Sequence, residues 1–307
     1  MKAFQFFHLQ DKANFKSDLA EHQTEPPKEL AWRTFGVAPV DTRYPDEEEE
    51  RFVGSSNHRE KHIDVVIVER ILPSAYIKKS VRELAEKHLI ATGETATRAM
   101  KAQWTEDFLN EHLPNAPLKE TKIRVCIFDG TNMVVGTSSQ KQADDVVSFV
   151  RHQLFEEPVV AKPTNSELFG QWLSTFLYNN NTDFNDFTFG SSCKIYSAST
   201  ERKISFTNDV GLYLAHETLV GSGGQSVTEM NMWNDDVGYT FTLTEKAVGK
   251  SLKVLLTQDR EEEFEAAKSS QDVVLRAQTE WHFLFDVIGS IHSLFNLIEN
   301  GGDDDDL

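Results

Sequence analysis

The pattern of apolar and polar positions switches between a two-residue and a helical period along the chain. Residues 4–9 (FQFFHL) and 63–68 (IDVVIV) are short apolar runs between polar loops, which is typical of strands. From 73 to 113, apolar residues instead recur every three or four positions. Gly93 interrupts this segment and Pro114 follows it, so the pattern predicts two helices joined as a hairpin.

The first predicted helix has a recognisable start and a mixed surface. A proline suits its first turn, and the hydroxyl of Ser74 is a candidate N-cap. Ile77 and Val81 fall on one face of the helix with the apolar residues that follow. Lys78 and Arg82 lie four residues apart on the flank of that face, which makes the start of this helix basic.

The remaining chain mixes strand and helix patterns without an internal repeat or a regular strand–helix–strand rhythm. This order favours an α+β fold with mixed antiparallel sheets. We divide the sequence into an N-terminal α+β region at 1–160, a C-terminal α+β region at 161–300 and an acidic tail at 301–307. Strands are predicted at 122–130, 132–139, 187–197 and 227–234, a strand pair at 237–256, and helices at 142–154, 165–177 and 261–299.

Composition makes this a strongly acidic chain of ordinary hydrophobicity. Its 307 residues carry a formal net charge of −18, with 39% hydrophobic and 26% charged residues. Much of the acidity is concentrated at 46–50, 261–265 and 303–306, and such runs are usually solvated. No apolar run is long enough to cross a bilayer, so we expect a cytoplasmic protein without a membrane partner. Cys126 and Cys193 are too few for a disulfide framework and are expected to be buried, reduced thiols.

Net charge does not exclude a nucleic-acid partner, because a polyanion responds to the local potential over a distance of roughly 8–10 Å. Basic residues gather on particular elements of this chain. Two of them, Lys122 and Arg124, alternate on one predicted strand and therefore share a face. The candidate phosphate contacts are Lys78, Lys79, Arg82, Arg98, Lys101, Lys122, Arg124 and Lys194.

Catalytic motifs are weak throughout the sequence. Residues 244–251 (TEKAVGKS) nearly match a phosphate-binding loop, but strand patterns on both sides indicate a turn. Part of a metal-dependent nuclease pattern is present at Asp186, Glu201 and Lys203. Such a site requires the carboxylates to converge on Mg²⁺. His58 and His62, in a loop-like context, are better explained as solvated histidines than as metal ligands. We therefore expect no catalytic site, no metal site and no cofactor.

The hairpin sequence resembles a known family. ILPSAYIKKSVRELAEKHL, continued by RAMKAQWTEDFLNEHLP, aligns without gaps from 71 to 114 with the I-L-P-S-x-x-I-K signature and charged hairpin of the bacterial recombination-associated protein RdgC. Further likeness runs through VVGTSSQKQADDVVSFVRHQL, ELFGQWL and FLFDVIGSIHSLFNLIENGG, and also includes FQFFHL and LAWRTFG. The resemblance covers nearly the whole chain and is most specific at 71–160 and 280–302.

The resemblance implies a non-catalytic DNA-binding protein whose horseshoe-shaped protomers form a ring-shaped homodimer around duplex DNA. Such a ring limits the access of a RecA-type recombinase to DNA, and the implied location is the nucleoid. A ring can be acidic outside and basic inside, which would reconcile the net charge with DNA binding. Single-stranded DNA is a further form that the protein would bind.

Two segments depart from the family pattern. The turn after the hairpin reads PNAPL (114–118), with Pro117 where the family carries an aromatic residue and Leu118 as a substitute dimer contact. The second segment, CKIYSASTERKI, keeps Lys194 as its basic residue and moves Arg202 and Lys203 toward the following helix. Such divergence would suit a copy carried by a phage or a mobile element.

Two other functions remain open. The net charge and the DDDD run at 303–306 fit an acidic inhibitor or DNA mimic that binds a recombinase or nuclease directly. A metal-dependent exonuclease would instead need Asp186 and Glu201 to meet. DNA binding at low salt would distinguish the leading hypothesis from an acidic inhibitor or DNA mimic. Mg²⁺-dependent degradation of DNA would reveal an exonuclease.

Overall fold

The computed structural model divides the chain into two compact units that do not follow the sequence in order. Unit 1 comprises Met1–Ser17, Pro39–Ile63 and Arg124–Leu307, and unit 2 comprises Asp18–Ala38 and Asp64–Ile123. The linear division at residue 160 stays a prediction. The structure describes residues 1–40, 52–57, 60–179, 183–184, 186–221, 224–254, 262, 265–266 and 273–300.

Unit 1 is built on an antiparallel sheet with the strand order β10-β9-β11-β12-β13-β1-β6-β5. Two strands, β4 (Glu60–Arg70) and β5 (Leu118–Phe128), begin in one unit and end in the other. The mixed α+β class predicted from the sequence is therefore confirmed. The other elements of unit 1 are β1 (Phe4–Leu9), β3 (Gly54–Asn57), β6 (Asn132–Val135), α3 (Gln140–Phe149), the π-helical turn η2 (Val150–Leu154), β7 (Ala161–Pro163), α4 (Ser166–Tyr178), β8 (Asp183–Phe184), β9 (Phe187–Ser197), β10 (Arg202–Thr207), α5 (Asn208–Gly221), β11 (Gln225–Asn234), β12 (Tyr239–Thr244), β13 (Val248–Val254) and α7 (Val273–Glu299).

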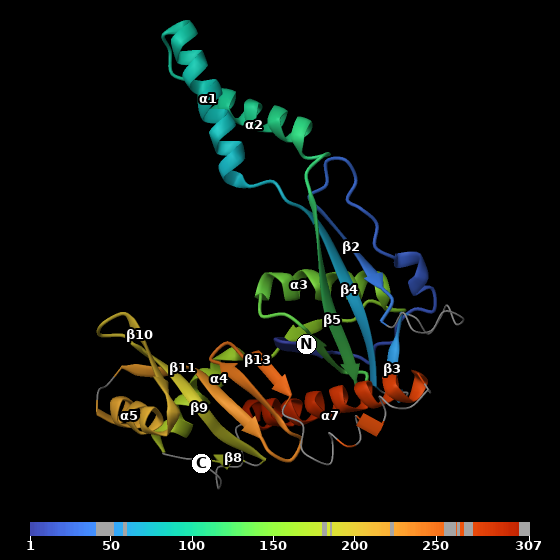
Figure 1. Ribbon diagram of the computed structural model, residues 1–307, viewed down its shortest axis with the longest axis vertical. Helices are drawn as coiled ribbons and strands as arrows, with labels where there is room; N and C mark the ends of the chain where they lie inside the picture. The colour runs from blue at the N-terminus through green and yellow to red at the C-terminus, as the bar shows by residue number, and fades with distance from the viewer. Residues whose placement is uncertain are drawn as a thin grey trace. The chain divides into compact units, whose positions relative to one another are not determined.

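Helices α4, α5 and α7 cover one face of the unit 1 sheet (Figure 1). The ring of Phe295 on α7 lies 4.6 Å from that of Phe6 on β1 and 4.7 Å from that of Phe169 on α4. Burying an aromatic side chain of this kind stabilises a fold by about 2–3 kcal/mol. Alternate residues of β9 and β11 point into this core, so the residues between them must face the opposite side of the sheet.

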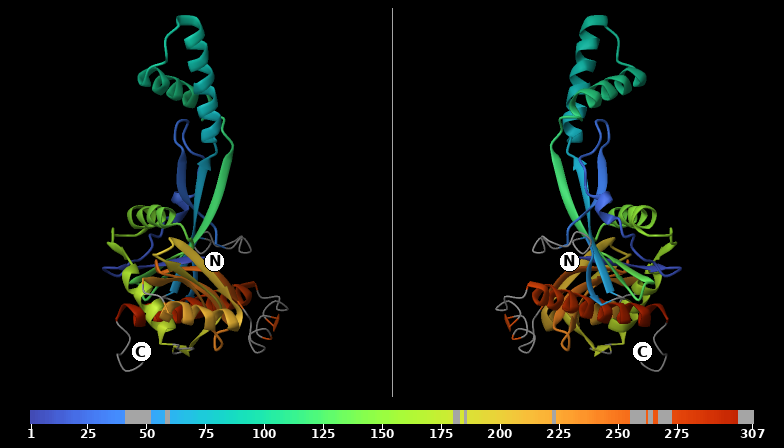
Figure 2. Two further views of the ribbon diagram at one scale, coloured as in Figure 1. Left: turned by 90° about the vertical axis from the view of Figure 1, so that its left-hand side faces the viewer. Right: turned by 90° about the vertical axis from the view of Figure 1, so that its right-hand side faces the viewer.

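Unit 2 contains a short sheet and the predicted helical hairpin. Its sheet has the order β5-β4-β2, in which β2 (Arg33–Ala38) pairs antiparallel with β4, and a 3₁₀ turn η1 (Leu19–His22) precedes β2. Helices α1 (Ser74–Thr92) and α2 (Arg98–His112) connect β4 to β5 (Figure 2). Gly93 ends α1 in the left-handed conformation at φ 74°, as the helix-stop signal predicted.

Arg70 fastens the base of the hairpin within unit 2. Its Nη1 donates to the carbonyl of Pro114 at 2.6 Å, and its Nη2 donates to the carbonyl of Pro27 at 2.9 Å. One planar guanidinium thus joins the end of β4 to the chain that returns from α2 and to the loop before β2.

Three local predictions need correction. Ser74 is the first residue of α1 and does not cap it, because Pro73 occupies the N-cap position and no side chain bonds there. Arg202 and Lys203 lie on strand β10, not in a helix, since α5 begins only at Asn208. His62 lies on β4 and is 0% exposed, packed 5.2 Å from the ring of Trp281, so it is not a solvated histidine. His58 lies outside the described residues.

Candidate nucleic-acid interface

The five basic residues predicted on the hairpin are all exposed on unit 2. Lys78, Lys79 and Arg82 occupy the first half of α1, while Arg98 and Lys101 lie in the first turn of α2. Thr97 caps α2 by accepting a hydrogen bond from the backbone N–H of Met100, which fixes where this turn begins. The structure therefore keeps these cations at the surface, where a phosphate could reach them.

The hairpin cations differ in how they are paired. Lys79 Nζ lies 3.9 Å from Glu83, and Arg82 Nε lies 3.7 Å from Glu86, each across one helical turn. Exposed pairs of this kind contribute only about 0.3–0.5 kcal/mol, so a phosphate could replace either carboxylate. Within the described parts of the chain, Lys78 and Lys101 form no ion pair.

The hairpin is less acidic than the rest of the chain. Residues 74–112 contain six Lys and Arg and six Asp and Glu, so their net charge is zero, against −18 for all 307 residues. Half of the carboxylates belong to the second half of α2, at Glu106, Asp107 and Glu111. The excess of basic over acidic side chains therefore lies in the first half of α1 and at the start of α2.

The two candidates on β5 have different surroundings. Lys122 Nζ lies 3.0 Å from a carboxylate oxygen of Asp64, whose side chain is only 1% exposed. Lys122 therefore balances a buried charge within unit 2, which is a structural role; its contact with phosphate stays a prediction. Arg124 belongs to unit 1 and is half-buried.

Lys194 faces the side of the unit 1 sheet opposite to α4, α5 and α7. Its Nζ donates to Glu229 Oε2 at 2.7 Å, and Lys250 Nζ donates to the other carboxylate oxygen at 3.3 Å. These three residues, together with the hydroxyls of Ser192 and Ser205, belong to the lining of a hollow of about 380 Å³ that we call the sheet-face pocket. Lysines and hydroxyls are the groups that commonly contact phosphate oxygens.

The electrostatics of the sheet-face pocket depend on Glu229. Burial alone would raise the pKa of this carboxyl group, but the hydrogen bonds and charges of Lys194 and Lys250 outweigh burial and lower it. Glu229 is consequently ionised at neutral pH and offsets part of the positive charge of the two lysines. The pocket as a whole keeps an excess of one positive charge.

Two lysines that are not among the predicted phosphate contacts, Lys203 and Lys250, also lie on this face. Lys250 follows the turn at 244–247, which joins β12 to β13 and confirms that the loop-like motif is a turn. On β10, Ser205 pairs with Lys194, so Lys203 two residues earlier points to the same side. Period-two alternation of Lys203, Ser205 and Thr207 on β10 is a sequence signal for this placement, but which strands become neighbours is not encoded locally.

The carboxylates of the nuclease pattern are not brought together. Asp186 directly precedes β9, and Glu201 lies in the left-handed turn that follows the same strand at φ 53°. The eleven residues of β9 separate the two by roughly 36 Å at about 3.3 Å per residue. The described residues contain no group of three or more His, Cys, Asp or Glu that could hold a metal ion.

Cys126 and Cys193 are both buried and are not joined in a disulfide, as predicted. Burial raises the pKa of the Cys193 thiol to about 12, so it remains protonated at neutral pH. The Cys193 side chain packs in the hydrophobic core on the covered face of the sheet, so it adds no charge to the sheet-face pocket.

The predicted dimer contact lies at the base of the hairpin. The carbonyl of Pro117 accepts a hydrogen bond from the N–H of Ile71 at 2.8 Å, which brings the two chain segments together within unit 2. Leu118 is 47% exposed and Ile71 is 43% exposed. These two aliphatic side chains leave apolar surface uncovered in the single chain.

No helix in the described part of the chain is long and apolar enough to span a membrane.

Comparison with known proteins identifies the family. No curated protein matches the sequence. A family model described as "Putative exonuclease, RdgC" matches residues 1–291, which is nearly the full chain and includes the hairpin, β5 and the sheet-face pocket. The chain therefore belongs to the RdgC family.

Proposed function

We propose that this chain is a sequence-nonspecific DNA-binding protein that limits the access of a RecA-type recombinase to DNA. Family membership provides the link to recombination. The observation that carries the proposal furthest is the sheet-face pocket, where Lys194 and Lys250 converge with hydroxyl groups on the open side of a sheet. Lysines and hydroxyls of this kind suit phosphate oxygens.

The second contact surface is the start of the hairpin. Lys78, Arg82 and Lys101 present exposed cations on two helices, and Lys79 and Arg98 extend this surface. Contacts of this type give affinity without sequence preference, because every phosphate is chemically alike. Lys122, Arg124 and Lys203 are secondary candidates.

We also assign a ring-shaped homodimer of horseshoe-like protomers to the protein, with Pro117 and Leu118 at one contact. Support comes from the apolar surface that Leu118 and Ile71 expose. A ring would retain DNA even through weak contacts, because dissociation requires the ring to open. The protein would act in the cytoplasm at the nucleoid, without a catalytic step and without a cofactor.

The test is charge reversal on each surface. Lys78→Glu with Lys101→Glu on the hairpin, and Lys194→Glu with Lys250→Glu on the sheet face, should each lower affinity for unrelated duplexes by the same factor. Each lost phosphate contact should also reduce the slope of log K against log salt by about 0.9. Lys253→Glu, in place of an exposed lysine at the end of β13, is a control for total charge. Unchanged DNA binding in both double variants would refute the assignment.

An exonuclease activity is a second candidate because the family description names one. The separation of Asp186 from Glu201 removes the residues that the sequence suggested for it. The check is incubation of linear and single-stranded DNA with Mg²⁺, and shortening of either DNA would establish the activity.

A further inference from the structure

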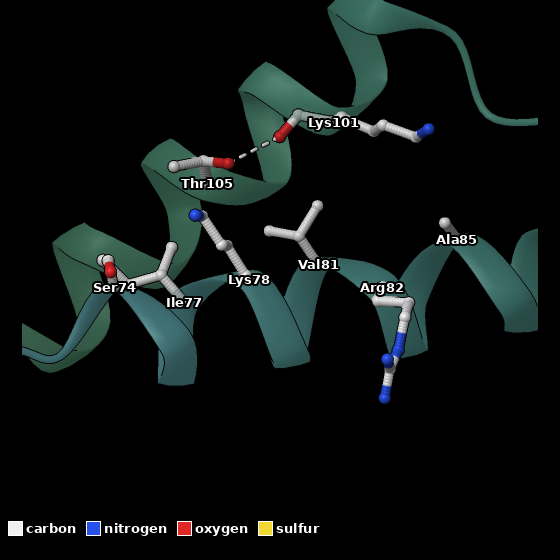
Figure 3. A pocket seen from close by; sticks show the side chains of 8 residues that line it. All are labelled: Ser74, Ile77, Lys78, Val81, Arg82, Ala85, Lys101 and Thr105. Carbon is white, nitrogen blue, oxygen red and sulfur yellow. Dashed lines mark hydrogen bonds between the residues drawn. The ribbon is translucent and has the colours of Figure 1, made fainter. Parts of the chain in front are cut away.

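The hairpin contains a groove that DNA binding does not explain. A hollow of about 440 Å³ lies between α1 and α2 (Figure 3). Ile77, Val81 and Ala85 form its floor, in a row at four-residue intervals along α1. The other lining residues are Ser74, Lys78, Arg82, Lys101 and Thr105.

The groove stays open because two helices alone cannot bury their apolar faces. No residue of α1 is buried, and α2 buries only Phe108. The aromatic contacts of the hairpin, Tyr76 with Phe108 at 5.2 Å and His88 with Trp104 at 6.0 Å, involve none of the lining residues. The floor of the groove therefore has room for side chains from a third helix.

The lining is apolar at its centre and positive at its edges. Lys78 extends toward Thr105 of α2, while Lys101 and the guanidinium of Arg82 point away from the floor on either side (Figure 3). The lining contains three cations and no carboxylate. Phosphates could use the cations, but they gain nothing from the row of aliphatic side chains.

We infer that this groove binds an acidic amphipathic helix of a partner protein. Ile77 to Ala85 spans roughly 12 Å, which corresponds to two helical turns. A partner helix with aliphatic residues at i, i+4 and i+8 would fill the floor, and Glu or Asp beside them would meet the three cations. Charge complementarity and the aliphatic row together select this occupant over a nucleic acid.

The groove shares Lys78, Arg82 and Lys101 with the proposed DNA surface, so an acidic helix and DNA would compete for the hairpin. This consequence rests on the proposed function, whereas the groove itself does not. The sheet-face pocket belongs to the other unit and has no lining residue in common with the groove. A bound helix would leave the sheet-face pocket free to bind phosphate.

The experiment is a fluorescence anisotropy titration of the full chain with a labelled helical peptide of roughly 15 residues, long enough to form a marginal helix. The peptide carries Leu at i, i+4 and i+8 and Glu beside them. Two control peptides replace Leu by Ser or Glu by Gln. We expect saturable binding of the first peptide and at least about tenfold weaker binding of each control, equivalent to 1.4 kcal/mol.

Matched variants locate the site. Ala85→Phe fills the groove and Lys101→Glu reverses a lining charge, and each should weaken peptide binding about tenfold. Lys87→Glu changes an exposed lysine of the same helix outside the lining and should change binding less than about twofold. Because Lys101 is exposed, its variant tests the groove even if Ala85→Phe perturbs packing.

Three results would overturn the inference. The first is absence of peptide binding. The second is equal binding of the Leu→Ser peptide, which would indicate that charge alone causes the binding. The third is a change in sedimentation of the Ala85→Phe variant without an effect on peptide affinity, which would show that a second copy of the chain occupies the groove. DNA affinity of the unsubstituted chain, measured in the same buffer, separates the two proposals: if this chain binds DNA but not the first peptide, only the groove is rejected.

Discussion

The ammonium group of Lys194 lies 2.7 Å from the carboxylate of Glu229, so a negative charge stands among the lysines of the sheet face. Lys250 shares the same carboxylate at 3.3 Å. This arrangement orders two cations in the absence of DNA, but a phosphate must compete with Glu229 for them.

Glu229→Gln should therefore increase affinity for duplex DNA. Removing one negative charge beside two lysines should raise affinity by about two- to fivefold at low salt, with a smaller gain at high salt because of screening. Anisotropy with a labelled duplex measures the change. Glu217→Gln on α5, which packs on the covered face of the sheet, is the matched control and should have little effect. Equal or weaker DNA binding by Glu229→Gln would indicate that DNA does not bind at the sheet-face pocket.

The same carboxylate should make stability depend on acid pH. The folded pKa of Glu229 lies below its ordinary value of 4.5, so its contribution to the free energy of unfolding is fully present above about pH 5. As pH falls through the folded pKa, this contribution is lost. Urea unfolding measures the difference in the free energy of unfolding between the wild type and Glu229→Gln. This difference should become smaller below pH 4.5, and a difference that grows on acidification would contradict the assignment.

Lys122→Ala should mainly reduce stability. It would leave the carboxylate of Asp64, which is 1% exposed, without the ammonium group at 3.0 Å, at a cost of about 2–3 kcal/mol. Lys119→Ala on the same strand breaks a pair with the half-exposed Glu69 and should cost less than about 1 kcal/mol. Denaturant unfolding measures both changes. Equal losses in the two variants would mean that the burial of Asp64 does not set the energy of this pair.

His292 on α7 should destabilise the protein as pH falls below neutrality. Burial lowers its pKa from 6.5 to about 4, and the charge of His8 acts in the same direction, whereas Asp129 and Glu299 oppose the shift. Between pH 6.5 and 4 the unfolded chain binds a proton that the folded chain does not, so the free energy of unfolding falls with decreasing pH.

His292→Phe should flatten this part of the stability profile, since its neighbours already include the ring of Phe128 at 4.6 Å. His282→Phe, at an exposed position of the same helix, should leave the profile unchanged. Thermal unfolding at a series of pH values distinguishes the two variants. The same dependence of thermal stability on pH in the wild type and in His292→Phe would mean that His292 is not the titrating group.

Local patterns predicted what depends on local sequence. The period of apolar residues, Gly93 and Pro114 were sufficient for α1 and α2, and period-two alternation was sufficient for β9. The convergence of Lys194, Glu229 and Lys250 was beyond reach, because it depends on which strands become neighbours. His62 was misassigned for the same reason, since the residues that bury it, Trp281 and Phe285, lie more than two hundred positions away in the chain.

The hairpin groove shows a related limit of sequence reasoning. The row of Ile77, Val81 and Ala85 was visible as an apolar face, but the helical period alone cannot say whether such a face is covered. Only the position of α2 shows that part of it remains open. Functional inference from the basic residues likewise required the family match, because single surface lysines carry little information.

We propose that phosphate contacts on the hairpin and the sheet face bind duplex DNA within a ring-shaped dimer. A titration against linear and closed-circular duplex across a salt series tests it most directly. We expect affinity that falls steeply with salt and is independent of sequence, together with retention on circles, but not on linear DNA, after a step to high salt. Absence of binding to either DNA at low salt would contradict it and would favour an acidic protein that acts on a recombinase or nuclease directly.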